Sequence, residues 1–297
     1  MTPMSNAALP IAPRKRPEPF ELTVREVRFE SPDTATLYLD PHGKTDYRAG
    51  QYLSIDAHQF LELKPWITWL EEQKGRREPI RQYSLTSAPH EPLVAITVKE
   101  ETYVPGEMKY PPLLSNLLVR GLAPGERFIA SGYTGPYVLP DDVDERARLV
   151  VHVVAGSGAV PNFSILKDAL HRRLAVRHVY VCSNKTRQDI LFARELDALA
   201  AAHPEQLKIL HSLTREPEAG DAYRHGRIDE ALLAEAIPES ERETCLVYAC
   251  GPAILPWDRR AALEAGTSPT PRFMETVLGH LHGLGIHDRH IRRETYG

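Results

Sequence analysis

Two stretches, Arg81-Gln82-Tyr83-Ser84 and Tyr248-Ala249-Cys250-Gly251-Pro252, lie in halves of the chain that differ in pattern. Around the first, short segments alternate apolar and polar residues between glycines and prolines, as the strands of an antiparallel barrel do. Around the second, apolar strand segments alternate with helical ones, which indicates a parallel sheet covered by helices. The sequence therefore predicts two domains, an antiparallel β-barrel followed by an α/β domain with a parallel sheet.

The same patterns place the individual elements and domain limits. Expected strands of the first half are 20–29, 36–39, 51–56 and 93–98, and those of the second half are 149–155, 178–182, 207–211 and 244–250. Expected helices are 163–174, 190–202, 228–236 and 254–265. Segment 64–80, which carries Trp66, Trp69 and a charged run, is expected to be a surface excursion with helical character. We expect a flexible lead-in at 1–19, a barrel domain at 20–145 and an α/β domain at 146–297.

Composition excludes several classes of function. The net charge of −4 gives no reason to expect a nucleic-acid partner, which would favour a basic face. No apolar run approaches the roughly 20 residues that a membrane-spanning helix needs. The three cysteines, Cys182, Cys245 and Cys250, fit a reducing cytoplasm better than a disulfide framework. A ferredoxin-type iron–sulfur cluster needs four thiolates, so any such cluster must lie on another protein.

A glycine-rich turn follows the first strand of the α/β half. Gly156 and Gly158 would let the backbone approach a pyrophosphate at the start of a helix, whose free N–H groups favour an anion. Pro161 stands near the start of that helix, and the third glycine of the dinucleotide fingerprint is absent. Taken alone, the motif is equally consistent with an ordinary tight turn.

The residue types in the two opening stretches suit a ligand that carries a phosphate and a ring. Arg81 offers a charge-assisted fork for a phosphate, Tyr83 a flat ring with a polar end, and Ser84 a small hydrogen-bond donor. Cys250 ends a strand of an open α/β sheet, where ligands bind. The alternatives are an ordinary amphipathic strand for the first stretch and a small buried hydrophobic residue for Cys250.

In order and in combination, these motifs resemble the ferredoxin–NADP reductase family, over nearly the whole chain from Phe20 onward. The resemblance implies an FAD-binding barrel and a nucleotide-binding α/β domain. Arg81 would bind the FAD pyrophosphate, Tyr83 would stack on the isoalloxazine, and Ser84 would lie near flavin N5. Further FAD contacts would come from Thr97, Val98, Lys99 and Ser115. Pro112 replaces a glycine of the family pattern, which removes one backbone N–H near the phosphate.

The resemblance also implies a site for a nicotinamide nucleotide. Its members would be Gly156, Gly158, Pro161, Ser183, Asn184, Lys185, Arg227, Cys250, Gly251 and Pro252. Four cations would be available to neutralise a 2′-phosphate: Lys185, Arg187, Arg224 and Arg227. They favour NADPH over NADH, with NADH as the alternative; a lysine at 185 lacks the planar fork of the arginine found in many relatives.

The end of the sequence, Glu294-Thr295-Tyr296, resembles the ending of plant-type reductases. The resemblance implies that Tyr296 covers the flavin face and that Glu294 shares a proton network with Ser84 and Cys250. These four residues are the expected catalytic set. The alternative for the tail is a frayed helix end.

The implied activity is hydride transfer from NADPH to FAD, followed by single-electron transfer to a ferredoxin or another iron–sulfur or haem acceptor protein. Alternatives are a flavin reductase, a haem-protein reductase and a non-catalytic regulatory module. No metal site is expected, because the late histidines are irregularly spaced: His280, His282, His287 and His290. The three tryptophans, Trp66, Trp69 and Trp257, are expected to be packing residues.

Overall fold

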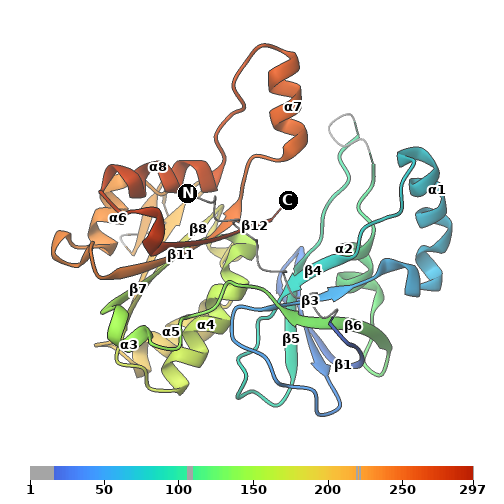
Figure 1. Ribbon diagram of the computed structural model, residues 1–297, viewed down its shortest axis with the longest axis horizontal. Coiled ribbons are helices and arrows are strands. Elements are labelled where there is room, and N and C mark those ends of the chain that lie inside the picture. The colour runs from blue at the N-terminus through green and yellow to red at the C-terminus, as the bar shows by residue number, and fades with distance from the viewer. Residues whose placement is uncertain (1–16, 106–109, 219, 221, 297) are drawn as a thin grey trace, which may run out of the picture.

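The computed structural model describes residues 17–105, 110–218, 220 and 222–296, and these residues form two sheets that lie side by side (Figure 1). The lead-in expected at 1–19 lies outside the described residues except for its last three, of which Pro19 opens the first strand. The change from one sheet to the other falls between residues 134 and 149. The boundary at residues 145 and 146 therefore stays a prediction within this stretch.

The first sheet is an antiparallel barrel, as expected. Its strands are β1 (Pro19–Ser31), β2 (Thr34–Asp40), β3 (Tyr52–Ile55), β4 (Arg81–Ser84), β5 (Val94–Lys99) and β6 (Arg127–Thr134). They are hydrogen-bonded in the order β4-β3-β6-β1-β2-β5, and every neighbouring pair is antiparallel. A bridge between Leu85 and Ile96 connects the end of β4 to β5 and closes the sheet on itself. Strand β6 was not among the expected strands.

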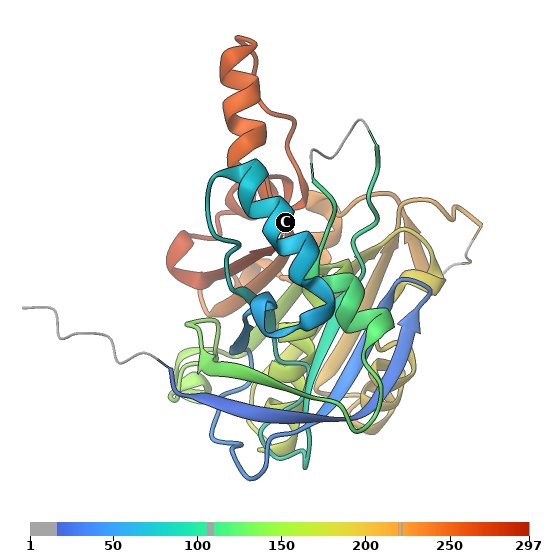
Figure 2. The same ribbon diagram turned by 90° about the vertical axis from the view of Figure 1, so that its right-hand side faces the viewer.

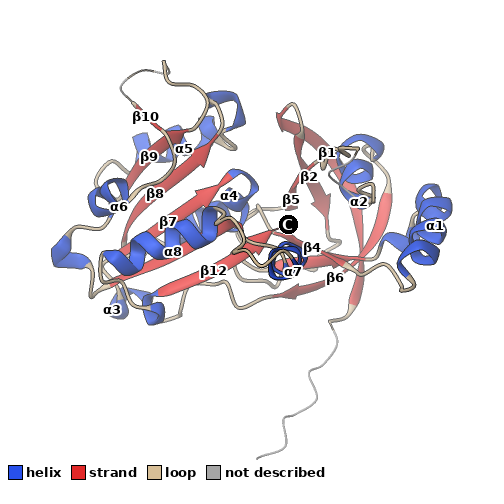
Figure 3. Ribbon diagram, turned by 90° about the horizontal axis from the view of Figure 1, so that it is seen from above, coloured by secondary structure: helices blue, strands red, loops and turns tan. Residues whose placement is uncertain are grey.

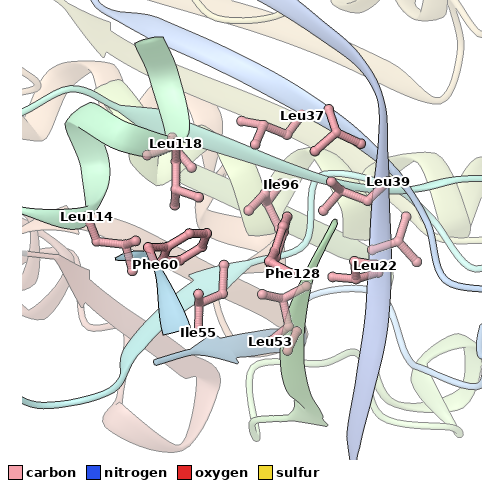
Figure 4. Packing of buried hydrophobic residues seen from close by; sticks show 14 of the residues in the cluster. Leu22, Leu37, Leu39, Leu53, Ile55, Phe60, Ile96, Leu114, Leu118 and Phe128 are labelled. Carbon is pink, nitrogen blue, oxygen red and sulfur yellow. The ribbon is translucent and has the colours of Figure 1, made fainter. Parts of the chain in front are cut away.

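The barrel interior is filled by side chains that alternate along the strands (Figure 4). Leu37 and Leu39 of β2 and Leu53 and Ile55 of β3 are fully buried, two residues apart in each strand. Phe128 of β6 packs in the same cluster. Because successive side chains of a strand point to opposite faces, this spacing fixes which face of each strand is the core face.

The second sheet is parallel, as expected from the alternation of strands and helices. Its strands are β7 (Leu149–Ala155), β8 (Arg177–Asn184), β9 (Leu207–Leu213), β10 (Tyr223–His225), β11 (Cys245–Pro252) and β12 (Ile291–Tyr296), in the order β10-β9-β8-β7-β11-β12. The main helices are α4 (Ala159–His171), α5 (Ala193–Ala202), α6 (Glu230–Ala236) and α8 (Phe273–Gly283). Helix α8 and strand β12 are additions to the expected elements.

The helices cover both faces of this sheet (Figure 3). Val151 and Val153 of β7 pack in one core with α6 and α8, whereas Val150 and Val154 pack in the cores on the α4 side. The carboxyl ends of β7, β8 and β11 lead to the junction with the barrel, and the carboxyl end of β12 lies there too (Figure 1). In open α/β sheets, ligands bind at this edge.

Two further helices stand on the surface. Helix α1 (Lys64–Lys74) lies within the expected excursion, buries Ile67 and Leu70, and ends at Gly75 in a left-handed conformation with φ of 62°. Helix α7 (Pro256–Glu264) has no buried residue and projects from the molecule (Figures 1 and 2). The shorter helices are α2 (Leu114–Asn116) and α3 (Val143–Arg146). Among the described residues, no helix is long and apolar enough to cross a membrane.

The expectation that the tryptophans are packing residues is wrong. Trp66 and Trp69 on α1 are 57% and 41% exposed, and Trp257 on α7 is 61% exposed. Trp66 and Trp69 contact each other edge to face, with ring centroids 6.5 Å apart. The core side of α1 is formed by the smaller residues Ile67 and Leu70, which lie three positions apart in the helix, so its tryptophans point outward.

Candidate active site

Four side chains from the two domains meet at the carboxyl edge of the parallel sheet. The Ser84 hydroxyl, at the end of β4, donates a hydrogen bond of 2.7 Å to Oε1 of Glu294 on β12. The Tyr296 hydroxyl donates to Ser84 Oγ at 3.3 Å. Cys250 packs in a core cluster against which Tyr296 also packs. The structure thus brings together the four residues that the sequence predicted to be catalytic.

The register between β11 and β12 explains this convergence. The two strands are parallel, with Cys250 opposite Glu294 and Pro252 opposite Tyr296. The end of the described chain is therefore a paired edge strand, and the alternative of a frayed helix end is wrong. Pairing with β11 holds Glu294 and Tyr296 in place, because both residues lie within the ladder.

Burial raises the pKa values of the three acidic groups of this cluster and so favours their protonated forms. Burial raises the pKa of Glu294, and the hydrogen bond from Ser84 opposes this rise only in part. Burial, followed by the nearby Glu294 charge, raises the pKa of Cys250 well above its usual range. Burial does the same to the Tyr296 phenol. Cys250 and Tyr296 are neutral groups at ordinary pH, and Glu294 is the member of the cluster best suited to exchange a proton.

The predicted flavin motif lies on β4, where Arg81 and Gln82 are exposed and Ser84 is buried. The Arg81 side chain is 50% exposed, and its guanidinium lies 3.4 Å from a carboxylate oxygen of the buried Glu78. The Tyr83 ring packs against the barrel core, and burial raises the pKa of its phenol. An accessible cation and a partly buried ring beside Ser84 fit one phosphate and one flat ring system.

Ser115, another predicted FAD contact, lies in a short helix. Helix α2 starts at Leu114 after Leu113, and no side chain caps its first turn. The Ser115 hydroxyl accepts a long hydrogen bond of 3.4 Å from the backbone N–H of Glu101. An uncapped helical turn leaves N–H groups for an anion, which fits a pyrophosphate near Ser115.

The three β5 residues expected beside the flavin, Thr97, Val98 and Lys99, have different environments. Val98 is buried in the barrel core. Lys99 donates a hydrogen bond of 2.6 Å to Asp33, so its charge is already paired. Thr97 is hydrogen-bonded to Thr36 and Thr86 inside the barrel.

The glycines of the predicted pyrophosphate turn have distinct structural roles. Gly156 has φ of +52°, and a Cβ on it would meet nothing within 4 Å, so the turn faces open space. A Cβ on Gly158 would lie 2.0 Å from the carbonyl oxygen of Cys250. Gly158 thus allows the start of α4 to pass directly against β11. Pro161 is buried in the first turn of α4.

A cavity of about 420 Å³ opens beside this turn. The predicted residues Ser183, Arg227 and Pro252 line it, together with Ala155, Thr214, Ile228, Thr270, Pro271, Arg272, Phe273, Thr276 and Val277. A Cβ on Gly251 would lie 2.5 Å from Cδ1 of Phe273, so Gly251 permits this wall of the cavity. Sequence reasoning missed the contribution of residues 270–277, because helix α8 was not recognised. Its apolar residues at 273, 274, 277 and 281 were the available signal.

The structure separates the four cations expected near a 2′-phosphate. Arg187 contacts Glu216 at 2.6 Å, and Arg224 is paired with Glu235 of α6. The described part of the chain provides no ion pair for Lys185 or Arg227. These two cations are the ones whose charge is available to a ligand.

The late histidines are divided between helix α8 and the segment after it. His280 and His282 belong to α8, and His282 lies 3.1 Å from Asp288. Within 17–105, 110–218, 220 and 222–296, no three His, Cys, Asp or Glu side chains are grouped as a metal site.

Several known proteins are similar to this chain in sequence. Residues 153–256 match the oxidoreductase NAD-binding domain. An NADPH oxidoreductase of Mycobacterium tuberculosis (strain ATCC 25618 / H37Rv) is 33% identical over 234 residues, which are 76% of this chain and 51% of that protein. The flavohemoprotein of Bacillus subtilis (strain 168) is 26% identical over 262 residues, 86% of this chain and 58% of that protein. The chain thus spans about half the length of these relatives.

Solved structures share the whole architecture. The flavohem-like FAD/NAD binding domain of nitric oxide dioxygenase from Vibrio cholerae O1 biovar El Tor has a TM-score of 0.68 and 24% identity, and the match covers 94% of this chain and 98% of that one. Ferredoxin–NADP⁺ reductase from Plasmodium falciparum has a TM-score of 0.61 and 16% identity, covering 94% and 96%. These likenesses confirm the two-domain fold expected from the sequence.

Proposed function

We propose that the chain is a member of the ferredoxin–NADP reductase-like family and an FAD-dependent NAD(P)H oxidoreductase that passes electrons to a one-electron acceptor protein. The observation that carries the proposal is the contact of Ser84 with Glu294 and Tyr296 across the two domains. An ordinary amphipathic strand would not require its serine to contact a half-buried carboxyl group and a phenol. A non-catalytic module would not need the contact.

A bound flavin would supply the ability to take up a hydride and to release single electrons. The residues of the chain would position it. Tyr83 would provide a ring surface, Arg81 a phosphate contact, and Ser84 a hydrogen bond at the reacting edge. Glu294 would hold or accept a proton through Ser84. Tyr296 lies against Ser84 and would have to move before a nicotinamide could occupy that position.

We propose NADPH as the preferred nucleotide. Lys185 follows the carboxyl end of β8, and Arg227 lines the cavity beside it. Neither carries an ion pair within the described residues, whereas Glu216, the acid nearest in sequence to the end of β9, is held by Arg187. An unpaired acid would favour a ribose 2′-hydroxyl, and unpaired cations favour a 2′-phosphate.

The acceptor is proposed to be a separate protein, a ferredoxin or another iron–sulfur or haem protein. The three cysteines of the chain are all free and buried, and they are too few for a four-thiolate cluster. Free thiols also support a reducing compartment such as the cytoplasm.

Stopped-flow spectroscopy of the purified protein tests the proposal. We expect a flavin spectrum that NADPH bleaches faster than NADH, followed by cytochrome c reduction when a suitable ferredoxin is added. Ser84→Ala should lower the rate of flavin reduction by about tenfold to a hundredfold, while Ser240→Ala, at an exposed distant site, should not. A protein that takes up no FAD would contradict the proposal.

A further inference from the structure

A second cleft lies at the domain junction, beside the start of β5. It has a volume of about 510 Å³, larger than the cavity at the nucleotide turn. Its walls come from both domains: Arg28, Tyr38, Thr86, Ser87, Glu91, Pro92, Leu93 and Ala95 from the barrel, and Phe163, Lys167, Phe192, Glu195, Ala198 and Leu199 from α4, α5 and the residue before α5. Figure 3 shows α4 and α5 on the side of the α/β domain that faces β1, β2 and β5.

The walls of this cleft are chiefly apolar. Phe163 and Phe192, which are 3% and 2% exposed, stack on each other with ring centroids 4.4 Å apart and form a rigid part of the lining. Tyr38 and Leu93 line the barrel side, and Leu199 lines the α5 side. A rigid lining of aromatic and aliphatic side chains favours a rigid apolar molecule such as a flat aromatic one, because such a molecule buries much apolar area at a small loss of conformational entropy.

The charges that line the cleft are already paired across the domain junction. Arg28 of the barrel contacts Glu195 of α5 at 2.9 Å, and Lys167 of α4 contacts Glu91 of the barrel at 2.5 Å. Each pair joins one positive to one negative side chain, so the four charges cancel. A charged ligand would have to disrupt one of these pairs, whereas an uncharged ligand leaves both intact.

Two hydroxyl groups of the lining, those of Thr86 and Ser87, are also engaged inside the protein. The Thr86 hydroxyl is hydrogen-bonded to Thr97, at 2.7 Å. The Ser87 hydroxyl oxygen accepts hydrogen bonds of 2.8 Å from the Tyr47 hydroxyl and from the backbone N–H of Ala95. The cleft therefore offers apolar contact and little demand for polar groups on the ligand.

We propose that this cleft is a second binding site, for an uncharged, flat aromatic molecule of two or three rings. Its volume lies within the range of about 300–1,000 Å³ typical of small-molecule pockets. The site differs in chemistry from the nucleotide cavity, which has unpaired Arg227 in its wall. It would exist in this protein whether or not the proposed reductase activity is correct.

Such a ligand would contact both domains and would therefore stabilise their association. The lining residues Thr86 and Ser87 lie two and three positions after Ser84, and Ser164 of α4 donates a hydrogen bond of 2.5 Å to the Ser87 carbonyl. Occupancy of the cleft would thus act on the segment that holds Ser84 in position.

Titration of the full chain with N-phenyl-1-naphthylamine tests the proposal, since this probe is uncharged, aromatic and fluorescent in apolar surroundings. We expect saturable binding of one probe per chain, retained in the presence of FAD and NADP⁺. Ala198→Trp should place a large side chain in the cleft and weaken binding at least tenfold. Ala201→Trp, exposed on the same helix but outside the lining, is the matched control and should bind the probe as the parent protein does.

Three outcomes would overturn the proposal. The first is the lack of saturable binding by the parent protein. The second is equal binding by Ala198→Trp, when circular dichroism shows that the variant is folded. The third is displacement of the probe by NADP⁺, which would place it in the nucleotide cavity instead.

Discussion

At the scale of the residue, the contact between Ser84 and Glu294 is the centre of the site. The sequence indicated both residues through motifs that lie 210 positions apart. It could not indicate that Glu294 would be largely buried, because burial depends on how the domains meet. The raised pKa of Glu294 is therefore a property of the folded molecule that no local pattern contains.

Glu294→Gln should stabilise the protein at neutral pH. The folded-state pKa of Glu294 is raised, so the unfolded chain ionises this carboxyl more readily. Burying this carboxyl therefore lowers the stability of the protein as pH rises above about 4.5, which is the pKa of Glu294 in the unfolded chain. Below that pKa the cost is absent. We expect the variant to melt at a higher temperature than the parent at pH 7, and the difference to shrink toward pH 4. A difference that grows toward pH 4 would contradict this assignment.

Tyr296→Ser should tighten nicotinamide binding. The Tyr296 hydroxyl contacts Ser84, so a nicotinamide can reach that position only when the ring moves. Removing the ring removes this competing state, and we expect apparent affinity to rise by about tenfold for NADP⁺ and also for NAD⁺. Titration of both oxidised nucleotides against the variant measures this change. Unchanged affinities would show that Tyr296 does not act as a gate.

Lys185→Ala should weaken NADPH binding more than NADH binding. Lys185 follows the carboxyl end of β8, and its charge is not paired with an acid within the described residues. Loss of one exposed phosphate contact is worth about 1–2 kcal/mol, which is roughly a tenfold increase in the KM for NADPH. Steady-state kinetics with both nucleotides measures the change. Arg224→Ala is the matched control, because Arg224 is paired with Glu235.

At the scale of the element, the sequence predicted strands and helices well where hydrophobic periodicity was strong. The central strands β7, β8 and β11 are apolar runs and were found close to their true limits. Strand β12, Ile-Arg-Arg-Glu-Thr-Tyr, has mainly polar residues and is a strand because β11 offers it a parallel edge. Such an element depends on its neighbour rather than on its own residues.

The close passage of α4 against β11 predicts a difference between two glycines. Gly158→Ala would place Cβ 2.0 Å from the Cys250 carbonyl oxygen, a backbone atom that cannot easily move. We expect a loss of about 3 kcal/mol or more in the free energy of unfolding, together with impaired nucleotide binding. In Gly156→Ala the added Cβ meets no atom within 4 Å, and only the positive φ is strained. We expect this variant to lose about 1 kcal/mol in the free energy of unfolding. Denaturant unfolding compares the two, and equal losses would contradict the proposed packing role of Gly158.

At the scale of the whole molecule, the domain junction could not be predicted from the sequence. Arg28 and Glu195 lie 167 positions apart and meet only because the domains pack together. The cleft that they border therefore has no local signature. The fold class, by contrast, followed from the change of pattern between the two halves of the chain, since periodicity reports on each domain separately.

A network of buried, hydrogen-bonded polar side chains lies under α4 and is a second feature that joins distant parts of the sequence. His152 is hydrogen-bonded to Asn162 at 2.8 Å and to His178 at 3.1 Å, and Asn162 donates to the Tyr137 hydroxyl at 3.0 Å. Burial lowers the pKa of His152 to about 4, and burial together with His152 lowers the pKa of His178 well below its usual range. Both imidazoles are therefore neutral in the folded protein near neutral pH.

The two neutral buried histidines of this network predict that the stability of the protein falls as pH decreases from about 6.5 toward 4. A histidine whose folded pKa is lowered takes up a proton on unfolding, so each of the two should contribute a slope of about 1.4 kcal/mol per pH unit in this window. Below pH 6.5 the raised pKa of His58, caused by its hydrogen bonds to Asp56 and Glu71, adds a constant stabilisation, because this imidazole is then charged in both the folded and the unfolded state. We expect His152→Gln to flatten the decline and His58→Gln to leave its slope unchanged, as measured by urea unfolding from pH 6.5 to pH 4.5. An equal slope in His152→Gln and in the parent protein would contradict the assignment of a neutral buried His152.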